Sequence, residues 1–178
     1  MSAAQYALNL SLLAYILISN VGTHEVTRRR LLLPVVLVAV AAGVFLNDPP
    51  TAGNDLRLEL VGVAAGTLLG VVAGLLVRVR VSAGRVLMTA GAAYAALWVL
   101  VIGGRMLFAY GADHWFTQRI GLFSYHHQIT GADAWTAAFV GMALAMVLTR
   151  VLVTWARSLA AVRAAEAAEP AEPAAVAA

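Results

Sequence analysis

Three histidines lie where they could do chemistry, because an imidazole side chain can bind a metal ion or carry a proton near neutral pH. His114, His126 and His127 fall within an aromatic-rich stretch, residues 105–133, together with Asp113. These four side chains would be the ligands of a metal site at the membrane surface. The chain has no HExxH motif and no pair of histidines at helical i, i+4 spacing. We therefore expect an ordinary cluster of surface histidines, with no bound metal and no other cofactor.

Glu59 and Arg105 are the charged residues best placed for a specific contact. Each lies near the same end of an apolar segment if the two segments run antiparallel. A charged side chain at the edge of the hydrocarbon is less costly when an opposite charge is close. This placement predicts an ion pair between Glu59 and Arg105, with Arg57 as a competing partner for the carboxylate. The alternative is that both side chains reach the lipid headgroups independently.

The motifs of common enzymes are absent from the sequence. No serine lies in a GxSxG turn, no phosphate-binding P-loop is present, and the chain contains no cysteine. No carboxylate lies deep within an apolar segment, where it could take part in a proton relay. The arginines are not interleaved with aromatic residues as in a nucleic-acid groove. These observations favour a protein that is not an enzyme and does not bind nucleic acid.

The composition is that of a membrane protein. Of the 178 residues, 62% are hydrophobic and only 12% are charged, whereas soluble domains carry about 25% charged residues. No water-soluble fold could bury so much apolar surface, so the lipid bilayer is the expected surroundings of the chain.

A row of small residues organises the most apolar segment, residues 57–77. Four glycines recur there at a spacing of four: Gly62, Gly66, Gly70 and Gly74. In a helix they form a groove without side chains, which lets a second helix approach closely. Residues 86–103 carry small rows, Gly91 with Ala95 and Ala92 with Ala96, which could receive the groove, and residues 134–155 carry a similar row with Gly141 at its centre. The alternative is that glycine is simply frequent in membrane helices.

The order of apolar and polar segments predicts an all-α fold, a polytopic transmembrane helical bundle within residues 1–156. About five spans are expected, at residues 4–21, 31–46, 57–77, 86–103 and 134–155, and an alternative is that the fourth continues across Gly103 and Gly104 to Tyr110. We expect a loop at 78–85 and a segment along the membrane interface at 105–133, between spans four and five. Residues 157–178 are rich in alanine, glutamate and proline, which predicts a disordered cytoplasmic tail.

The arginines decide the expected orientation, because cytoplasmic loops are enriched in basic residues. With the N-terminus outside, nine arginines fall on the cytoplasmic side, and three, Arg57, Arg105 and Arg119, fall outside. The abundance of alanine and the absence of lysine suggest a high-GC bacterial genome. We therefore expect a multi-pass protein of a bacterial inner (plasma) membrane, with its N-terminus outside and its C-terminus in the cytoplasm.

Residues Val26 to Pro34, VTRRRLLLP, resemble the basic loop of the CcdC-like proteins, a family of small bacterial integral membrane proteins of unknown function. In that family a glycine-rich span, an arginine-bearing loop and an arginine late in the next span follow. The corresponding residues here are 62–74, 78–85 and Arg105, and the resemblance covers about residues 5–155. It implies an integral membrane protein without an assigned activity.

Helix–helix association is the function that these features favour, either with a second copy in a homo-oligomer or with a membrane partner protein. Small rows in spans four and five suggest that the glycine groove first serves the protein's own bundle. The alternative is a small permease or channel-like component, whose path would be lined by Gln5, Asn9, Thr67 and Thr89. A metal-binding membrane protein is a further alternative.

Overall fold

The computed structural model describes residues 22–25, 36, 40, 53–82 and 85–168. The elements in these residues are β1 (Gly22–Glu25), α3 (Asp55–Leu76), β2 (Val77–Ser82), β3 (Arg85–Ala90), α4 (Ala92–His114), α5 (Thr117–His126) and α6 (Ala132–Ala168). The first two predicted spans, residues 4–21 and 31–46, lie outside the described residues, apart from residues 36 and 40, which are helical.

Three of the described helices, α3, α4 and α6, are long and apolar enough to cross a membrane. The 22 residues of α3 and the 23 of α4 correspond to about 33 to 35 Å of helix, slightly more than a hydrocarbon core of about 30 Å. This confirms the prediction of a mainly helical chain with segments of membrane-spanning length. The number of five spans stays a prediction.

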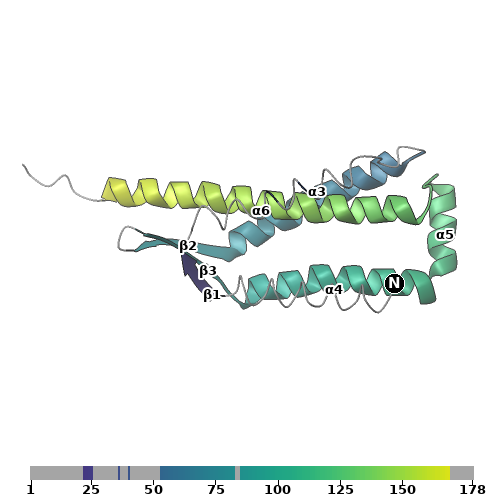
Figure 1. Ribbon diagram of the computed structural model, residues 1–178, viewed down its shortest axis with the longest axis horizontal. Helices are drawn as coiled ribbons and strands as arrows, with labels where there is room; N and C mark the ends of the chain where they lie inside the picture. The colour runs from purple at the N-terminus through teal and green to yellow at the C-terminus, as the bar shows by residue number, and fades with distance from the viewer. Residues whose placement is uncertain (1–21, 26–35, 37–39, 41–52, 83–84, 169–178) are drawn as a thin grey trace, which may run out of the picture.

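The helices α3, α4 and α6 run along the length of the molecule, with a sheet toward one end and α5 at the other (Figure 1). α3 and α6 run in the same direction side by side, while α4 returns in the opposite direction. Where the helices meet the sheet, buried side chains from α3, both hairpin strands, α4 and α6 form one hydrophobic core. Its members are Ala73, Val77, Ala90, Tyr94, Trp98 and Met146.

The prediction of an all-α fold is wrong at one end of the bundle, where β1, β3 and β2 form a three-stranded antiparallel sheet. The expected loop at 78–85 and the expected start of span four are instead the hairpin of β2 and β3. The sequence VRVRVS of β2 alternates apolar and polar residues with the period of two of a strand that has one buried face. Valine also favours strands, because its branched side chain packs well on a pleated surface.

The interfacial segment predicted at 105–133 is also not what the structure contains. α4 begins at Ala92 and continues through Gly103 and Gly104 to His114, so Arg105 lies within a helix of membrane-spanning length. Each glycine costs about 1 kcal/mol of helix propensity. Breaking the helix within a bilayer would expose unpaired backbone groups to lipid, which costs several kcal/mol for each group. The rest of the stretch contains the short helix α5, which connects the ends of α4 and α6 (Figure 1).

The last described helix extends beyond the fifth predicted span. α6 runs from Ala132 to Ala168, so residues 157–168, predicted to belong to a disordered tail, are helical. Alanine makes up six of these twelve residues and is the strongest helix former. Residues 169–178 lie outside the described residues.

Candidate functional site at the interface of α3 and α6

The glycine row of α3 lies directly against α6. A methyl group added to any of its four glycines would overlap an atom of α6, so only glycine allows the two helices to lie this close. The facing pairs are Gly62 with Ala138, Gly66 with Met142, Gly70 with Met146 and Gly74 with Val153. At Gly70 the added carbon would lie 2.6 Å from the carbonyl oxygen of Met146. Residue numbers increase together along both helices, which are therefore parallel.

α6 contributes small residues to the same interface. A Cβ atom at Gly141 would lie 3.3 Å from a methyl carbon of Val63 on α3. Ala138 on α6 and Ala73 on α3 are buried. Small residues on both helices thus let the backbones approach, and dispersion contacts replace the side-chain interdigitation of ordinary helix packing.

Hydrogen bonds hold the start of α3 to the loop that precedes α6. The carboxylate of Asp55 is fully buried and accepts two hydrogen bonds from Thr130, one from its backbone N–H at 2.9 Å and one from its hydroxyl. The amide side chain of Asn54 donates to the carbonyl oxygen of His127 at 2.9 Å. The Asp55 carboxylate also lies at a helix N-terminus, where the helix dipole favours a negative charge.

Arg157 of α6 holds the other end of α3. Its Nη1 atom donates to the carbonyl oxygens of Gly74 at 2.8 Å, Leu75 at 3.1 Å and Val77 at 2.5 Å. The last carbonyls of a helix have no partners within the helix and carry partial negative charge. One guanidinium group from α6 therefore satisfies the end of α3 and fixes the direction in which the chain enters β2.

A polar and aromatic cluster joins α4 to α6 next to the sheet. The guanidinium carbon of Arg150 lies 5.4 Å from the ring centre of Tyr94, a cation–π geometry. Tyr94 also packs edge-on against Trp98, with ring centres 6.2 Å apart. Both rings are buried, and the Tyr94 hydroxyl and the Trp98 indole N–H have no hydrogen-bond partner among the described residues.

Aromatic rings fill the opposite end of the bundle, between α4, α5 and α6. The ring of Phe108 on α4 lies 5.2 to 5.9 Å from the rings of Phe116, Trp135 and Phe139. The indole N–H of Trp135 donates to the buried hydroxyl of Ser124 on α5 at 3.2 Å. This cluster fixes the position of α5 across the ends of the two longer helices.

The structure does not bring Glu59 and Arg105 into contact, and no ion pair joins them. α3 and α4 lie apart toward the α5 end of the bundle, where α5 bridges the space between α4 and α6 (Figure 1). One carboxylate oxygen of Glu59 is buried without a hydrogen-bond partner within the described part of the chain. Arg57, the predicted competitor, is exposed.

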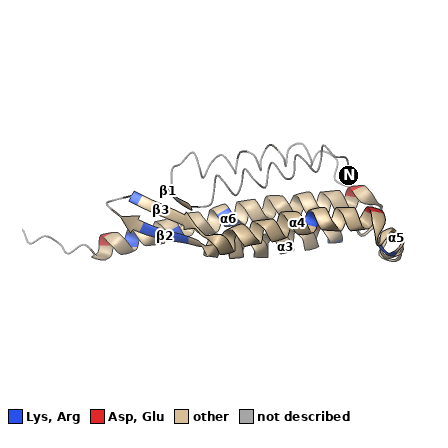
Figure 2. Ribbon diagram, turned by 90° about the horizontal axis from the view of Figure 1, so that it is seen from below, with Lys and Arg blue, Asp and Glu red and all other residues tan. Residues whose placement is uncertain are grey.

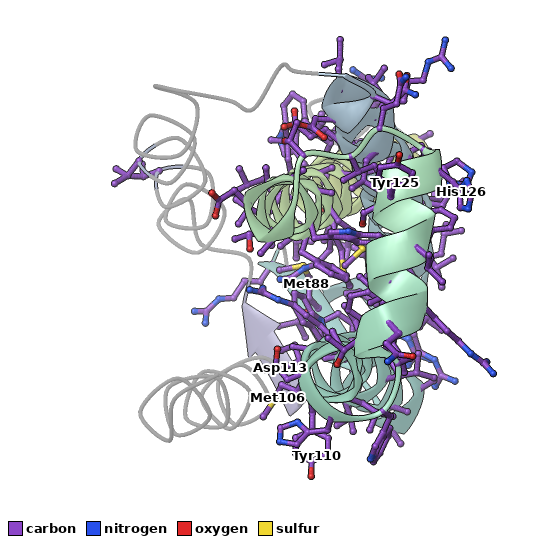
Figure 3. The ribbon with its side chains drawn as sticks, turned by 90° about the vertical axis from the view of Figure 1, so that its right-hand side faces the viewer. Met88, Met106, Tyr110, Asp113, Tyr125 and His126 are labelled. Carbon is purple, nitrogen blue, oxygen red and sulfur yellow. The ribbon has the colours of Figure 1, made fainter. Side chains whose placement is uncertain are left out.

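The candidate metal ligands lie at two separate places. Asp113 is near the end of α4 and His126 is at the far end of α5 (Figure 3). His114 and His127 each form a hydrogen bond through Nδ1 with the carbonyl oxygen four residues earlier and stack on an aromatic ring. Among the described residues, no group of three or more histidine, cysteine, aspartate or glutamate side chains could hold a metal ion.

The threonines proposed to line a solute path are placed apart from each other. Thr67 is exposed on α3, and its hydroxyl donates to the carbonyl oxygen of Val63 in its own helix. Thr89 lies in β3, outside the membrane-length helices. Gln5 and Asn9 lie outside the described residues.

Sequence reasoning missed the polar contacts that hold the helix pair at its ends. In the sequence Arg157 is one of the nine arginines that indicate orientation, and Asp55 lies just before the span expected at residues 57–77. The signal that could have found Asp55 is an acidic residue in the first turn of a predicted helix. No local signal pairs Arg157 with Gly74 or Arg150 with Tyr94, because each contact joins separate helices.

Comparison with known proteins returns no relative. No family model matches the chain, no curated protein matches it, and no solved structure matches it. The resemblance to CcdC-like proteins therefore stays a prediction.

Proposed function

We propose that this chain is a non-catalytic membrane scaffold. It crosses the membrane about five times, holds the sheet of β1, β3 and β2 at one membrane surface, and works by associating with another membrane protein or a second copy. The observation that carries the proposal is the length of α6. Its 37 residues span about 55 Å, compared with about 30 Å for the hydrocarbon core. Residues 157–168 extend past the end of α3 and accompany the hairpin, so bundle and sheet form one continuous body (Figure 1).

The register of β1 supports the further spans and their direction. Gly22 pairs with Ala90 at the point where β3 leads into α4, and β1 runs antiparallel to β3. This register places the first residue of β1 at the α4 end of the sheet, which is compatible with the span proposed for residues 4–21. The arginines of the sheet and of the end of α6 then share one membrane face, the cytoplasmic face according to the positive-inside tendency.

The depth of Arg105 within α4 favours a further span, proposed at residues 4–21, that packs on this helix. Arg105 lies 13 residues after Ala92, about 20 Å into the helix, too deep to be left unpaired at low cost. Within the described residues its side chain has no hydrogen bond and no ion pair with Glu59.

Exposed apolar side chains support association through the outer faces of the bundle. Leu68 of α3 and Leu100 of α4 are 69% and 71% exposed. The glycine row is already occupied by α6, so a second protein would pack on these outer faces instead. Lipid can cover such faces as well, and the oligomeric state separates the two cases.

The test is the mass of the protein extracted from membranes together with its lipids in polymer nanodiscs. The scaffold proposal expects a particle larger than one copy of the chain. Combining Leu68→Ala with Leu100→Ala should reduce that mass, whereas Leu122→Ala on α5, also exposed, should not. A single copy that carries a solute into proteoliposomes would contradict the proposal and favour the permease alternative.

A further inference from the structure

The hairpin of β2 and β3 has two chemically different faces. On one face Val77 and Ala90 are paired in register and buried, in contact with the core. On the opposite face Arg78 and Arg80 are both exposed. Successive side chains of a strand alternate between faces, so these two arginines point the same way and lie about 7 Å apart.

The position of β2 puts both arginines close to the lipid headgroups. α3 ends at Leu76 and β2 follows without a loop, so Leu76 lies near the hydrocarbon boundary if α3 spans the core. At about 3.3 Å per residue, Arg78 and Arg80 lie about 7 and 13 Å beyond it. The headgroup layer is about 5 to 7 Å thick on each side, and a long arginine side chain can extend back toward it.

The two hairpin strands that carry these arginines hold further basic but no acidic side chains. β2 and β3 contain no aspartate or glutamate, and Arg85 lies on the same face of the hairpin, in register with Ser82. The nearest acidic residue within the sheet is Glu25 in β1. Glu25 and Arg80 are both paired with Leu87 of the central strand β3, one on each side of it. Two strand spacings, about 9.6 Å, separate these positions. Figure 2 shows basic residues along β2 and β3 at this end of the molecule.

We propose that Arg78 and Arg80 bind the phosphate groups of anionic phospholipids in the leaflet next to the sheet. A guanidinium group matches phosphate with a planar fork of donors and is more weakly hydrated than an ammonium group. A basic residue close to an anionic membrane surface contributes about fivefold to binding. The inference rests on the membrane orientation in the proposed function and adds a partner for its sheet.

The test compares retained lipids by native mass spectrometry of the full chain in micelles doped with equal amounts of phosphatidylglycerol and phosphatidylcholine. The wild type should retain phosphatidylglycerol in preference, and Arg78→Gln with Arg80→Gln should weaken this preference about tenfold to thirtyfold. Arg57→Gln with Arg119→Gln, two exposed arginines outside the sheet, should leave it unchanged. Arg78→Lys with Arg80→Lys should retain part of the preference, because the charge remains.

Three results would overturn the proposal: equal retention of the two lipids by the wild type, an unchanged preference after loss of Arg78 and Arg80, or an equal loss with the control pair. Competition by millimolar inorganic phosphate as effective as by the lipid would show that the site takes free phosphate instead. Orientation is tested separately by labelling Ser82→Cys and Gln118→Cys in intact cells with an impermeant maleimide. Labelling of Gln118→Cys alone supports the proposed orientation. Labelling of Ser82→Cys alone contradicts that orientation but does not affect the lipid preference measured in micelles.

Discussion

Arg157 and Gly74 are 83 residues apart in the sequence, yet the guanidinium of Arg157 donates a hydrogen bond of 2.8 Å to the Gly74 carbonyl oxygen. Gly74 is also the last member of the glycine row, where α3 lies against Val153 of α6. The close approach of the two backbones brings Arg157 within reach of the carbonyls at the end of α3. Tight packing and the polar contact therefore depend on each other.

Replacing Arg157 with leucine should destabilise the bundle. The end of α3 would lose its only described side-chain donor to Gly74, Leu75 and Val77. Hydrogen bonds to charged groups contribute about 1.5 to 3 kcal/mol, so we expect a loss near the middle of that range. Unfolding by sodium dodecyl sulfate in mixed micelles measures it. Arg163→Leu, an exposed position on the same helix, is the control and should change stability by less than about 0.5 kcal/mol.

Alanine at two glycines should have effects of opposite sign. At Gly66 an added methyl group would overlap the backbone of Met142, so α3 and α6 must separate, at a cost of about 1 to 3 kcal/mol. At Gly103, within α4, the same methyl group meets nothing within 4 Å. There alanine should stabilise the helix by about 0.5 to 1 kcal/mol. The same unfolding assay checks both, and equal effects at the two sites would show that the α3–α6 contact is not this close.

Cysteine pairs can test the register of β1, because the chain contains no cysteine of its own. Thr23 and Thr89 are directly paired between β1 and β3, and antiparallel partners lie about 4.5 to 5.5 Å apart at Cα, within the range for a disulfide. Thr23→Cys with Thr89→Cys should therefore cross-link under mild oxidation. Thr23→Cys with Leu87→Cys, two residues out of register, should cross-link far less. The reverse preference would mean that β1 pairs with β3 in a different register.

The sequence predicted the helical membrane class because that information is local. Hydrophobic content and segment length are read residue by residue, and a bilayer requires each span to satisfy its own backbone hydrogen bonds. The same argument explains why α4 continues through Gly103 and Gly104. The glycine row could also be read directly, since i and i+4 residues share one helix face.

The sheet was missed although its signal was present. The alternation of valine with arginine in β2 has the period of a strand, but arginines between apolar segments are also typical of a cytoplasmic loop. The ion pair expected between Glu59 and Arg105 failed for another reason. Depth in the membrane can be estimated from the sequence, whereas the lateral distance between α3 and α4 depends on the packing of all the helices.

By itself the sequence determined that the chain contains helices long and apolar enough to cross a membrane and that one of them carries a groove of glycines. Only the tertiary structure decided that α6 fills this groove, that Thr130 binds the Asp55 carboxylate and that Arg157 caps α3. The physical reason is the range of the interactions involved. A helical face depends on neighbours three and four residues apart, whereas these contacts join residues 75 to 83 positions apart and form only when whole helices pack together.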